Sequence, residues 1–209
     1  MMPRARTPGD RFLLVRIGFT HVPSPMPKLL VLFQSPSPDV IALAEAAVAG
    51  ARSVRFAEVD LRRLDRGDAG SHATASDSAG RAYRTVEHLD DIAAYDGVIL
   101  AVPATASGAT RALAESFGSL GGSLVDKVGS VVTSASGEAR KAVLSDALTA
   151  MGDCGMILVP APTGNSDATA AEWAQRIGKR VAEVIGWVTH ARSHHHHEPH
   201  QHGDHSHHH

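Results

Sequence analysis

The sequence is short of aromatic residues, of cysteine and of any excess of one charge. Aromatic residues make up 4% of the 209 residues, and the single cysteine is Cys154. A lone cysteine cannot form an internal disulfide, which fits a reducing compartment, so we expect a cytoplasmic protein. The 20 Lys and Arg residues are scattered and are balanced by 22 Asp and Glu. The basic surface that nucleic acid requires is therefore not expected.

Long apolar stretches are missing as well. The longest runs have the length of a strand, far short of the roughly 20 apolar residues that cross a bilayer, so no membrane segment is expected. Near the N-terminus, Arg11 and Arg16 interrupt the apolar residues of "RFLLVRIGF", and no small-residue cleavage site follows. We expect residues 1–26 to be a disordered extension, or to reflect a start assigned too early, with Met26 opening the folded part.

One folded domain is expected over residues 27–190, where strand and helix patterns alternate. Continuous apolar runs are typical of parallel strands covered on both faces, and an alternating run is typical of a half-buried strand. The five predicted strands are 28–33, 53–59, 97–102, 128–133 and 155–160.

Helical spacing of apolar residues follows most of these strands. The predicted helices begin near Val40 and span 85–95, 109–117, 138–151 and 168–188, whereas the small and polar residues of 67–81 indicate a loop. Such alternation predicts an α/β fold with a doubly wound five-stranded parallel sheet and helices on both faces. Ligands of this fold bind beyond the carboxyl ends of the strands, near the point where the strand order reverses.

Four stretches of the sequence resemble one known family. They are "PKLLVLFQSPSPDVIALAEAAVAGA", "YDGVILAVPATASG", "DKVGSVVTSASGE" and "LTAMGDCGMILVP". Together they are similar to the flavodoxin-like NAD(P)H:quinone oxidoreductases of the WrbA type, over nearly all of residues 28–190. The resemblance implies a flavodoxin-like sheet of order 2-1-3-4-5, a bound FMN, NAD(P)H as electron donor and a quinone as the acceptor of two electrons. It also implies a homodimer or homotetramer.

The resemblance also assigns cofactor-binding positions, which follow the first, third and fourth predicted strands and precede the fifth. No catalytic acid or base is implied, because the flavin carries the reaction and the protein positions it. The implied FMN-binding residues are Ser35, Ser37, Asp39, Val40, Pro103, Ala104, Thr105, Ala106, Ser107, Gly108, Ser134, Ala135, Ser136, Gly137 and Cys154.

The first of these loops departs from the family pattern. Pro38 stands where the family has glycine, Asp39 where it has histidine or asparagine, and Ala42 where it has a hydroxyl residue. A helix N-terminus holds phosphate through backbone N–H groups, but proline has none, and the Asp39 carboxylate would repel the anion. The same residues suit a helix start, with Ser37 as cap, Pro38 in the first position and Asp39 in the first turn.

The other loops keep part of the pattern. Pro103 is retained, but the arginine and the aromatic residue that follow it in the family are absent. The segment 134–137 keeps its serine and glycine character, and Cys154 takes the place of a family histidine that lies near the flavin. The residues themselves favour a structural role for Cys154, as a small buried residue that enters a strand, because nothing nearby in the sequence would lower the pKa of its thiol.

The C-terminal residues 191–209 form a histidine-rich tail that we expect to be disordered. Neutral imidazole binds Zn, Ni or Cu, so the tail is a candidate metal-binding segment if it is not an expression tag. Its candidate ligands are His194, His195, His196, His197, His200, His202, His205, His207, His208 and His209.

Three functions remain open from the sequence, one of which, a flavodoxin-type electron carrier, meets the same objection from the Pro38 loop as the first function below. The first is an FMN-dependent NAD(P)H:quinone oxidoreductase. The second is a flavodoxin-like scaffold that has lost FMN and acts through protein interaction or through metal binding by its tail. The loop around Pro38 and Asp39 favours the second, and the family-like strands around all three loops favour the first.

Overall fold

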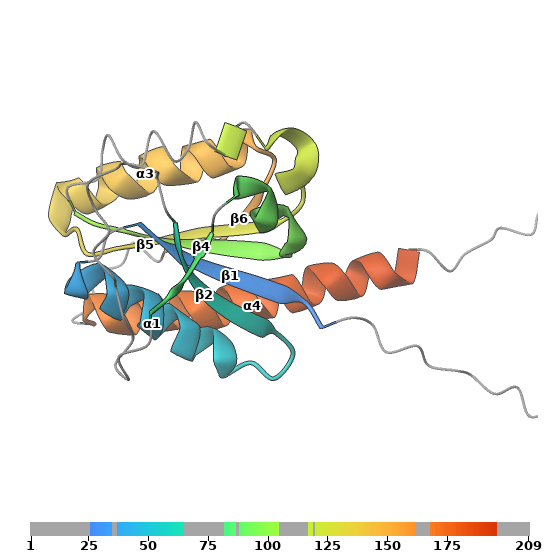
Figure 1. Cartoon of the computed structure of the whole chain (residues 1–209), viewed down its shortest axis with the longest axis horizontal. Helices are drawn as coiled ribbons and strands as arrows, with labels where there is room; N and C mark the ends of the chain where they lie inside the picture. Colours follow the sequence, from blue (N-terminus) through green and yellow to red (C-terminus); the bar gives the residue numbers. More distant parts are fainter. Residues whose placement is uncertain are drawn as a thin grey trace, which may run out of the picture.

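A parallel six-stranded sheet forms the centre of the structure (Figure 1). The computed structural model describes residues 26–34, 37–64, 82–86, 88–104, 117–118, 120–161 and 168–195. The sheet order is β3-β2-β1-β4-β5-β6, and all five pairs of neighbouring strands are parallel. The strands are β1 (Lys28–Phe33), β2 (Glu58–Leu64), β3 (Arg84–Val86), β4 (Gly97–Val102), β5 (Val128–Thr133) and β6 (Ile157–Leu158).

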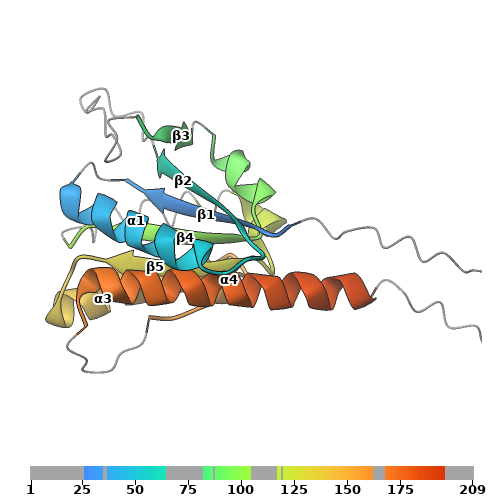
Figure 2. The same cartoon turned by 90° about the horizontal axis from the view of Figure 1, so that it is seen from below.

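Helices cover both faces of this sheet (Figure 2). On one face lie α1 (Pro38–Arg52) and α4 (Ala170–His195), and on the other lie α3 (Gly137–Asp153) and the 3-10 helices η1 (Leu89–Ala94) and η2 (Gly121–Leu124). Alternate residues of β1 therefore enter two separate cores: Leu29 and Val31 pack beneath α1 and α4, while Leu30 and Leu32 pack on the opposite side. Burial on both faces explains why this strand is apolar from Leu29 to Phe33.

The predicted sheet order is confirmed, although the predicted number of strands is one too few. When β3 at the sheet edge is set aside, the other five strands follow the order 2-1-3-4-5. The additional strand comes from the start of the segment 85–95, which was predicted to be helical throughout. Val86 is buried and pairs with Leu64 of β2, so this tertiary contact draws the β-branched pair Thr85-Val86 into the sheet. Only the 3-10 helix η1 remains of the predicted helix.

Three of the predicted strands, 28–33, 97–102 and 128–133, have the predicted bounds. The strand predicted at 53–59 is wrong, because β2 spans Glu58–Leu64. Ser53 instead closes α1, with its hydroxyl donating a hydrogen bond to the Gly50 carbonyl at 2.6 Å, and Phe56 is exposed. The charged residues Asp60 and Arg62 of β2 pair with each other, which lets a polar sequence form a strand.

The remaining elements differ at their ends. β6 has two residues rather than six, and its late start follows from Gly155, which turns the chain with φ of 75° two residues before it. The last helix runs to His195, beyond its predicted end near Val188, and α3 exceeds its prediction at both ends. The loop predicted at 67–81 lies outside the described residues, as does the helix predicted at 109–117 except for its last residue.

Helices α1 and α4 cross closely at two glycines. A Cβ atom on Gly50 would collide with the backbone of Gln175, and one on Gly178 would collide with the backbone of Ala47. Each glycine thus faces the carbonyl of the residue three positions before the other glycine. The side-chain direction in helices, which tilts toward the N-terminus, accounts for this offset.

A charged cluster joins β2 to the end of η1. The Tyr95 hydroxyl donates a hydrogen bond to Asp60 Oδ2 at 2.6 Å, and Arg62 reaches the same oxygen at 3.2 Å. Burial, reinforced by this hydrogen bond and by the charge of Asp60, raises the pKa of Tyr95 to about 12. Burial opposes ionisation of Asp60, but the Tyr95 and Arg62 contacts outweigh it and hold its pKa below the usual value.

Tyr95→Phe should therefore change how the free energy of unfolding depends on pH under alkaline conditions. A folded-state pKa raised from 10 to about 12 contributes stability below pH 10 that is lost as the pH rises toward 12. The variant should be less stable by about 1–2 kcal/mol at neutral pH and should lack this loss, as measured by urea unfolding at a series of pH values. In an Asp60→Asn background the difference should shrink; an unchanged difference would show that the hydrogen bond is not its cause.

Candidate functional site

Three of the loops that the sequence assigns to cofactor binding begin at one edge of the sheet. β1, β4 and β5 are neighbours and parallel, and their registers place Phe33 opposite Ala101 and Val102 opposite Thr133. Neighbouring strands lie about 4.8 Å apart, so Gln34, Pro103 and Ser134 begin their loops close together. The strand order reverses at β1, the position at which doubly wound sheets bind ligands.

The first loop leads into α1 with the helix start that the sequence predicts. Ser37 is the N-cap, Pro38 occupies the first turn and Asp39 places its carboxylate there. The Ser37 side chain makes no capping hydrogen bond, so the expected side-chain cap is not formed. Instead the Ser37 carbonyl accepts hydrogen bonds from the amides of Val40 at 3.1 Å and Ile41 at 3.0 Å.

This helix start offers an anion few donors. Pro38 has no N–H, and the Val40 and Ile41 amides are already directed at Ser37. The Val40 side chain is fully buried in the core beneath α1, so it contributes packing rather than a ligand contact. Asp39 is exposed at the same point and carries a negative charge. The local geometry therefore favours helix formation over phosphate binding.

The loop after β5 is more open to a ligand. Ala135 is buried and its amide donates to Thr133 Oγ1 at 3.2 Å, while Ser134 is half-buried and Ser136 and Gly137 are exposed. Gly137 has φ of 58°, a conformation that favours glycine, and a Cβ atom there would meet open space. Two serine hydroxyls and a bare stretch of backbone thus lie together at this edge.

Of the loop after β4, the structure describes the half-buried Pro103 and the exposed Ala104. Four assigned residues of this loop and one of the first loop lie outside the described residues. They are Thr105, Ala106, Ser107, Gly108 and Ser35.

Cys154 does not join these loops. It follows α3 and precedes β6, so it lies at the amino edge of the parallel sheet, opposite the carboxyl edge where the loops begin. The 17 residues of α3 carry the chain from one edge to the other, about 25 Å at 1.5 Å per residue. Cys154 packs against the core, and burial raises the pKa of its thiol. The interpretation as a small structural residue fits this position.

Gln34 is the residue that sequence reasoning missed. It directly follows β1, and its Nε2 atom is buried without a hydrogen-bond partner among the described residues. An unpaired buried amide costs about 1–3 kcal/mol, so this donor calls for a further partner such as a water or a ligand. The signal in the sequence is an amide side chain that directly follows the apolar run from Leu29 to Phe33.

The tail assigned to metal binding lies almost wholly outside the described residues. His194 and His195 end α4, and the remaining candidate ligands, from His196 to His209, follow it. Within the described ranges no group of three His, Cys, Asp or Glu side chains could hold a metal ion. None of the helices in those ranges is long and apolar enough to cross a membrane.

A curated relative decides the family. The NAD(P)H dehydrogenase (quinone) of Acidithiobacillus ferrooxidans (strain ATCC 53993 / BNL-5-31) is 34% identical over 149 residues, which cover 66% of this chain and 72% of that protein. The chain belongs to the NAD(P)H dehydrogenase (quinone) family. This confirms the family resemblance of the four sequence stretches. No protein-family model matches the chain.

Solved structures similar to this family member are flavodoxin-like. A WrbA-like flavodoxin from Agrobacterium tumefaciens has a TM-score of 0.48 at 18% identity, covering 77% of this chain and 98% of the other. A flavodoxin from the domain Archaea has a TM-score of 0.45 at 17% identity, covering 76% of this chain and 99% of the other. The sheet order of this chain is established by the pairing of its own strands.

Proposed function

We propose that the protein is an FMN-dependent NAD(P)H:quinone oxidoreductase whose flavin binds at the carboxyl edge of β1, β4 and β5. The observation that carries the proposal is the alignment of three loop starts at the point where the strand order reverses. Membership in the NAD(P)H dehydrogenase (quinone) family supports the same reaction. The chemistry that FMN supplies when bound is acceptance of two electrons from NAD(P)H and their transfer to a quinone.

The residues at this edge suit a flavin better than they suit its phosphate. Gln34 offers an amide donor that has no partner among the described residues, and Ser134 and Ser136 offer hydroxyls beside the bare backbone of Gly137. These neutral groups can hydrogen-bond ring carbonyls and ribityl oxygens. Asp39 at the start of α1 is the adverse group, since its carboxylate lies where a phosphate would bind. We assign binding to the three loops and leave Cys154 out.

Titration of the purified protein with FMN tests this proposal. We expect saturable binding with a change in flavin fluorescence, and NAD(P)H oxidation that depends on an added quinone. Gln34→Met should weaken FMN binding by about tenfold, equivalent to about 1.4 kcal/mol. The same variant should leave the flavin-free protein as stable or more stable, because an unpaired buried donor is removed.

Ser123→Ala is a matched control, because Ser123 is exposed in η2, remote from the three loops in the sheet topology. It should leave the affinity for FMN unchanged. A protein that binds no FMN at micromolar concentrations would overturn the proposed function. Unchanged FMN affinity in Gln34→Met would instead reject only the role of that residue.

We further propose a cytoplasmic homodimer or homotetramer with a folded domain near residues 27–190. The choice between NADH and NADPH does not enter the proposal. The histidine-rich tail is proposed to bind Zn, Ni or Cu independently of the flavin. Calorimetric titration of the full chain and of a chain ending at Ser193 separates these sites, since truncation should abolish metal binding and leave FMN binding intact.

A second function is favoured by the start of α1. Pro38, the exposed Asp39 and the engaged amides of Val40 and Ile41 together disfavour a phosphate. On this alternative the protein is a flavodoxin-like scaffold that acts through a protein partner or through its tail. The absence of FMN binding together with metal binding by the tail would support it.

A further inference from the structure

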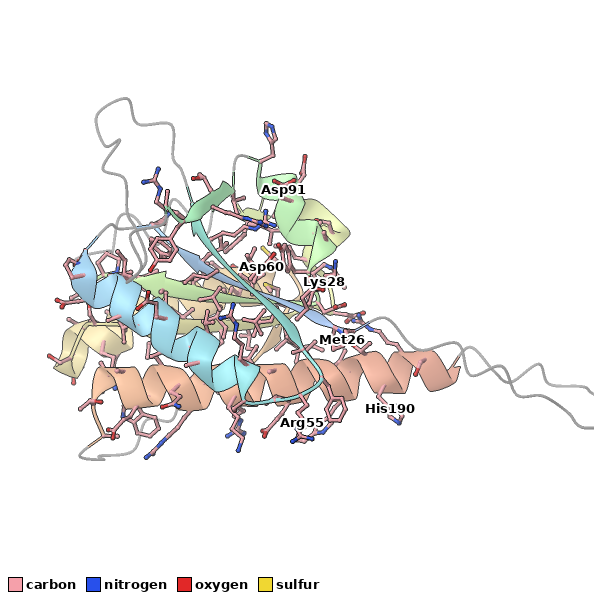
Figure 3. All side chains as sticks on the ribbon, turned by 60° about the horizontal axis from the view of Figure 1, so that its bottom comes forward. Met26, Lys28, Arg55, Asp60, Asp91 and His190 are labelled. Carbon is pink, nitrogen blue, oxygen red and sulfur yellow. The ribbon has the colours of Figure 1, made fainter. Side chains whose placement is uncertain are left out.

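Three large apolar side chains are exposed together beside the C-terminal half of α4. Met26 is 55% exposed, Phe56 71% and Trp187 70%. They line one groove of about 670 Å³, whose floor includes Gly186. Figure 3 shows Met26, Arg55 and His190 around this part of α4, and Figure 2 shows that the helix continues past the sheet. We call this surface the Trp187 face; it lies away from the three loops of the proposed flavin site.

Gly186 adds an independent reason to expect a partner on the Trp187 face. Glycine weakens a helix interior, so its presence usually has a packing reason. Gly50 and Gly178 have one, since they allow α1 and α4 to cross closely. A Cβ atom on Gly186 would meet no atom within 4 Å. The bare backbone at Gly186 is thus open to close approach from outside the described fold.

We propose that the Trp187 face binds the same face of a second copy of this chain across a two-fold axis. The face is self-complementary in shape, because it carries both a projecting ring, Trp187, and a groove large enough to receive one. In a two-fold contact each copy inserts its ring into the groove of the other. Antiparallel α4 helices would meet at Gly186, where the missing side chain allows the closest approach.

The charges along α4 fit the same arrangement. Glu183 and His190 both line the groove and lie about one helical turn on either side of the Gly186–Trp187 midpoint. A two-fold axis through this midpoint places the Glu183 carboxylate of one copy beside the His190 imidazole of the other. Two such contacts would form, one at each end of the apolar centre.

The apolar area is of the size expected for the centre of a small dimer interface. Two aromatic side chains that are about 70% exposed offer on the order of 300 Å² between them. A standard interface buries about 800 Å² per partner, with an apolar centre and a polar rim. Arg180 and Lys179, which line an adjoining groove with Trp187, would supply part of that rim. The inference rests on the self-association proposed above and does not depend on flavin binding.

Sedimentation velocity of the full chain at several concentrations tests the proposal. The wild type should be dimeric in the micromolar range, and Trp187→Glu should weaken the dimer at least tenfold. Gly186→Gln should do the same while favouring the α4 helix, so a loss of dimer cannot be attributed to unfolding. Ala142→Glu is the matched control, because Ala142 is exposed on α3, which covers the opposite face of the sheet, and should leave the dimer intact.

Three other outcomes would contradict the inference. A wild type that remains monomeric would reject self-association, whatever its affinity for FMN. A dimer that resists both Trp187→Glu and Gly186→Gln would place the interface elsewhere and leave the proposed function untouched. If acrylamide quenches Trp187 only after residues 1–25 are deleted, that segment covers the groove, and the two-copy interface is rejected.

Discussion

Gly178→Ala is expected to lower the free energy of unfolding by about 2 kcal/mol, because a methyl group has no room where α1 and α4 cross. The added Cβ atom would collide with the Ala47 backbone of α1, and a backbone cannot move aside as a side chain can. Overpacking of this kind costs about 1–3 kcal/mol or more, against a gain of about 1 kcal/mol from alanine in a helix. Urea unfolding measures the difference.

Gly152→Ala provides the control for this prediction. Gly152 also lies in a helix, α3, but its Cβ atom would be 3.5 Å from the Leu158 side chain, an ordinary contact. The substitution should be neutral or stabilising by up to about 1 kcal/mol. Gly50→Ala should resemble Gly178→Ala, and the double variant should lose less than the sum because both act at one crossing. Equal effects at Gly152 and Gly178 would contradict the close crossing.

The second large effect is a gain of function at the start of α1. Replacing Pro38 by Gly and Asp39 by Asn should raise the affinity for FMN by at least tenfold. The first change restores a backbone N–H, and the second removes a charge that, about 5 Å from a phosphate dianion in water, costs about 1.7 kcal/mol. Isothermal titration with FMN measures the affinity.

The same double variant should be less stable without ligand. Asp39 interacts favourably with the helix dipole and Pro38 suits the first helical position, so their loss should cost about 1 kcal/mol. Asp153→Asn is the control of equal charge change at the opposite edge of the sheet, and its affinity for FMN should be that of the wild type. An unaltered affinity in the double variant would mean that no phosphate binds at α1.

The strands that the sequence predicts correctly are those buried on both faces. In β1 and β4 nearly every residue is apolar, and in β5 the small polar residues Ser130 and Thr133 are buried among valines, so each run itself marks the strand. β2 has no such apolar run. Its charged residues Asp60 and Arg62 are accommodated because they pair with each other and because Tyr95 donates a hydrogen bond to Asp60. β3 exists only because Val86 packs beside Leu64.

The sequence likewise predicts some features of the candidate site and not others. The sequence locates three loops and the helix start at Ser37, Pro38 and Asp39, because strand-to-helix transitions and capping residues are local signals. Cys154 lies at the opposite edge because it precedes β6 of a parallel sheet, a position that the predicted strands already imply and that the family assignment overlooked. The unpaired Gln34 amide, by contrast, depends on which groups surround it in the fold.

By itself, the sequence determined the family, the alternation of strands and helices, and the sheet order implied by that family, and it singled out the loops proposed here to bind a cofactor. These rest on local periodicity and on residue identity at matched positions. Only the tertiary structure decided which glycines are required at the α1–α4 crossing, which amide is left without a partner and which aromatic ring remains exposed beside a groove. Each of these depends on atoms distant in the sequence, and packing against such atoms leaves no periodic trace in the chain.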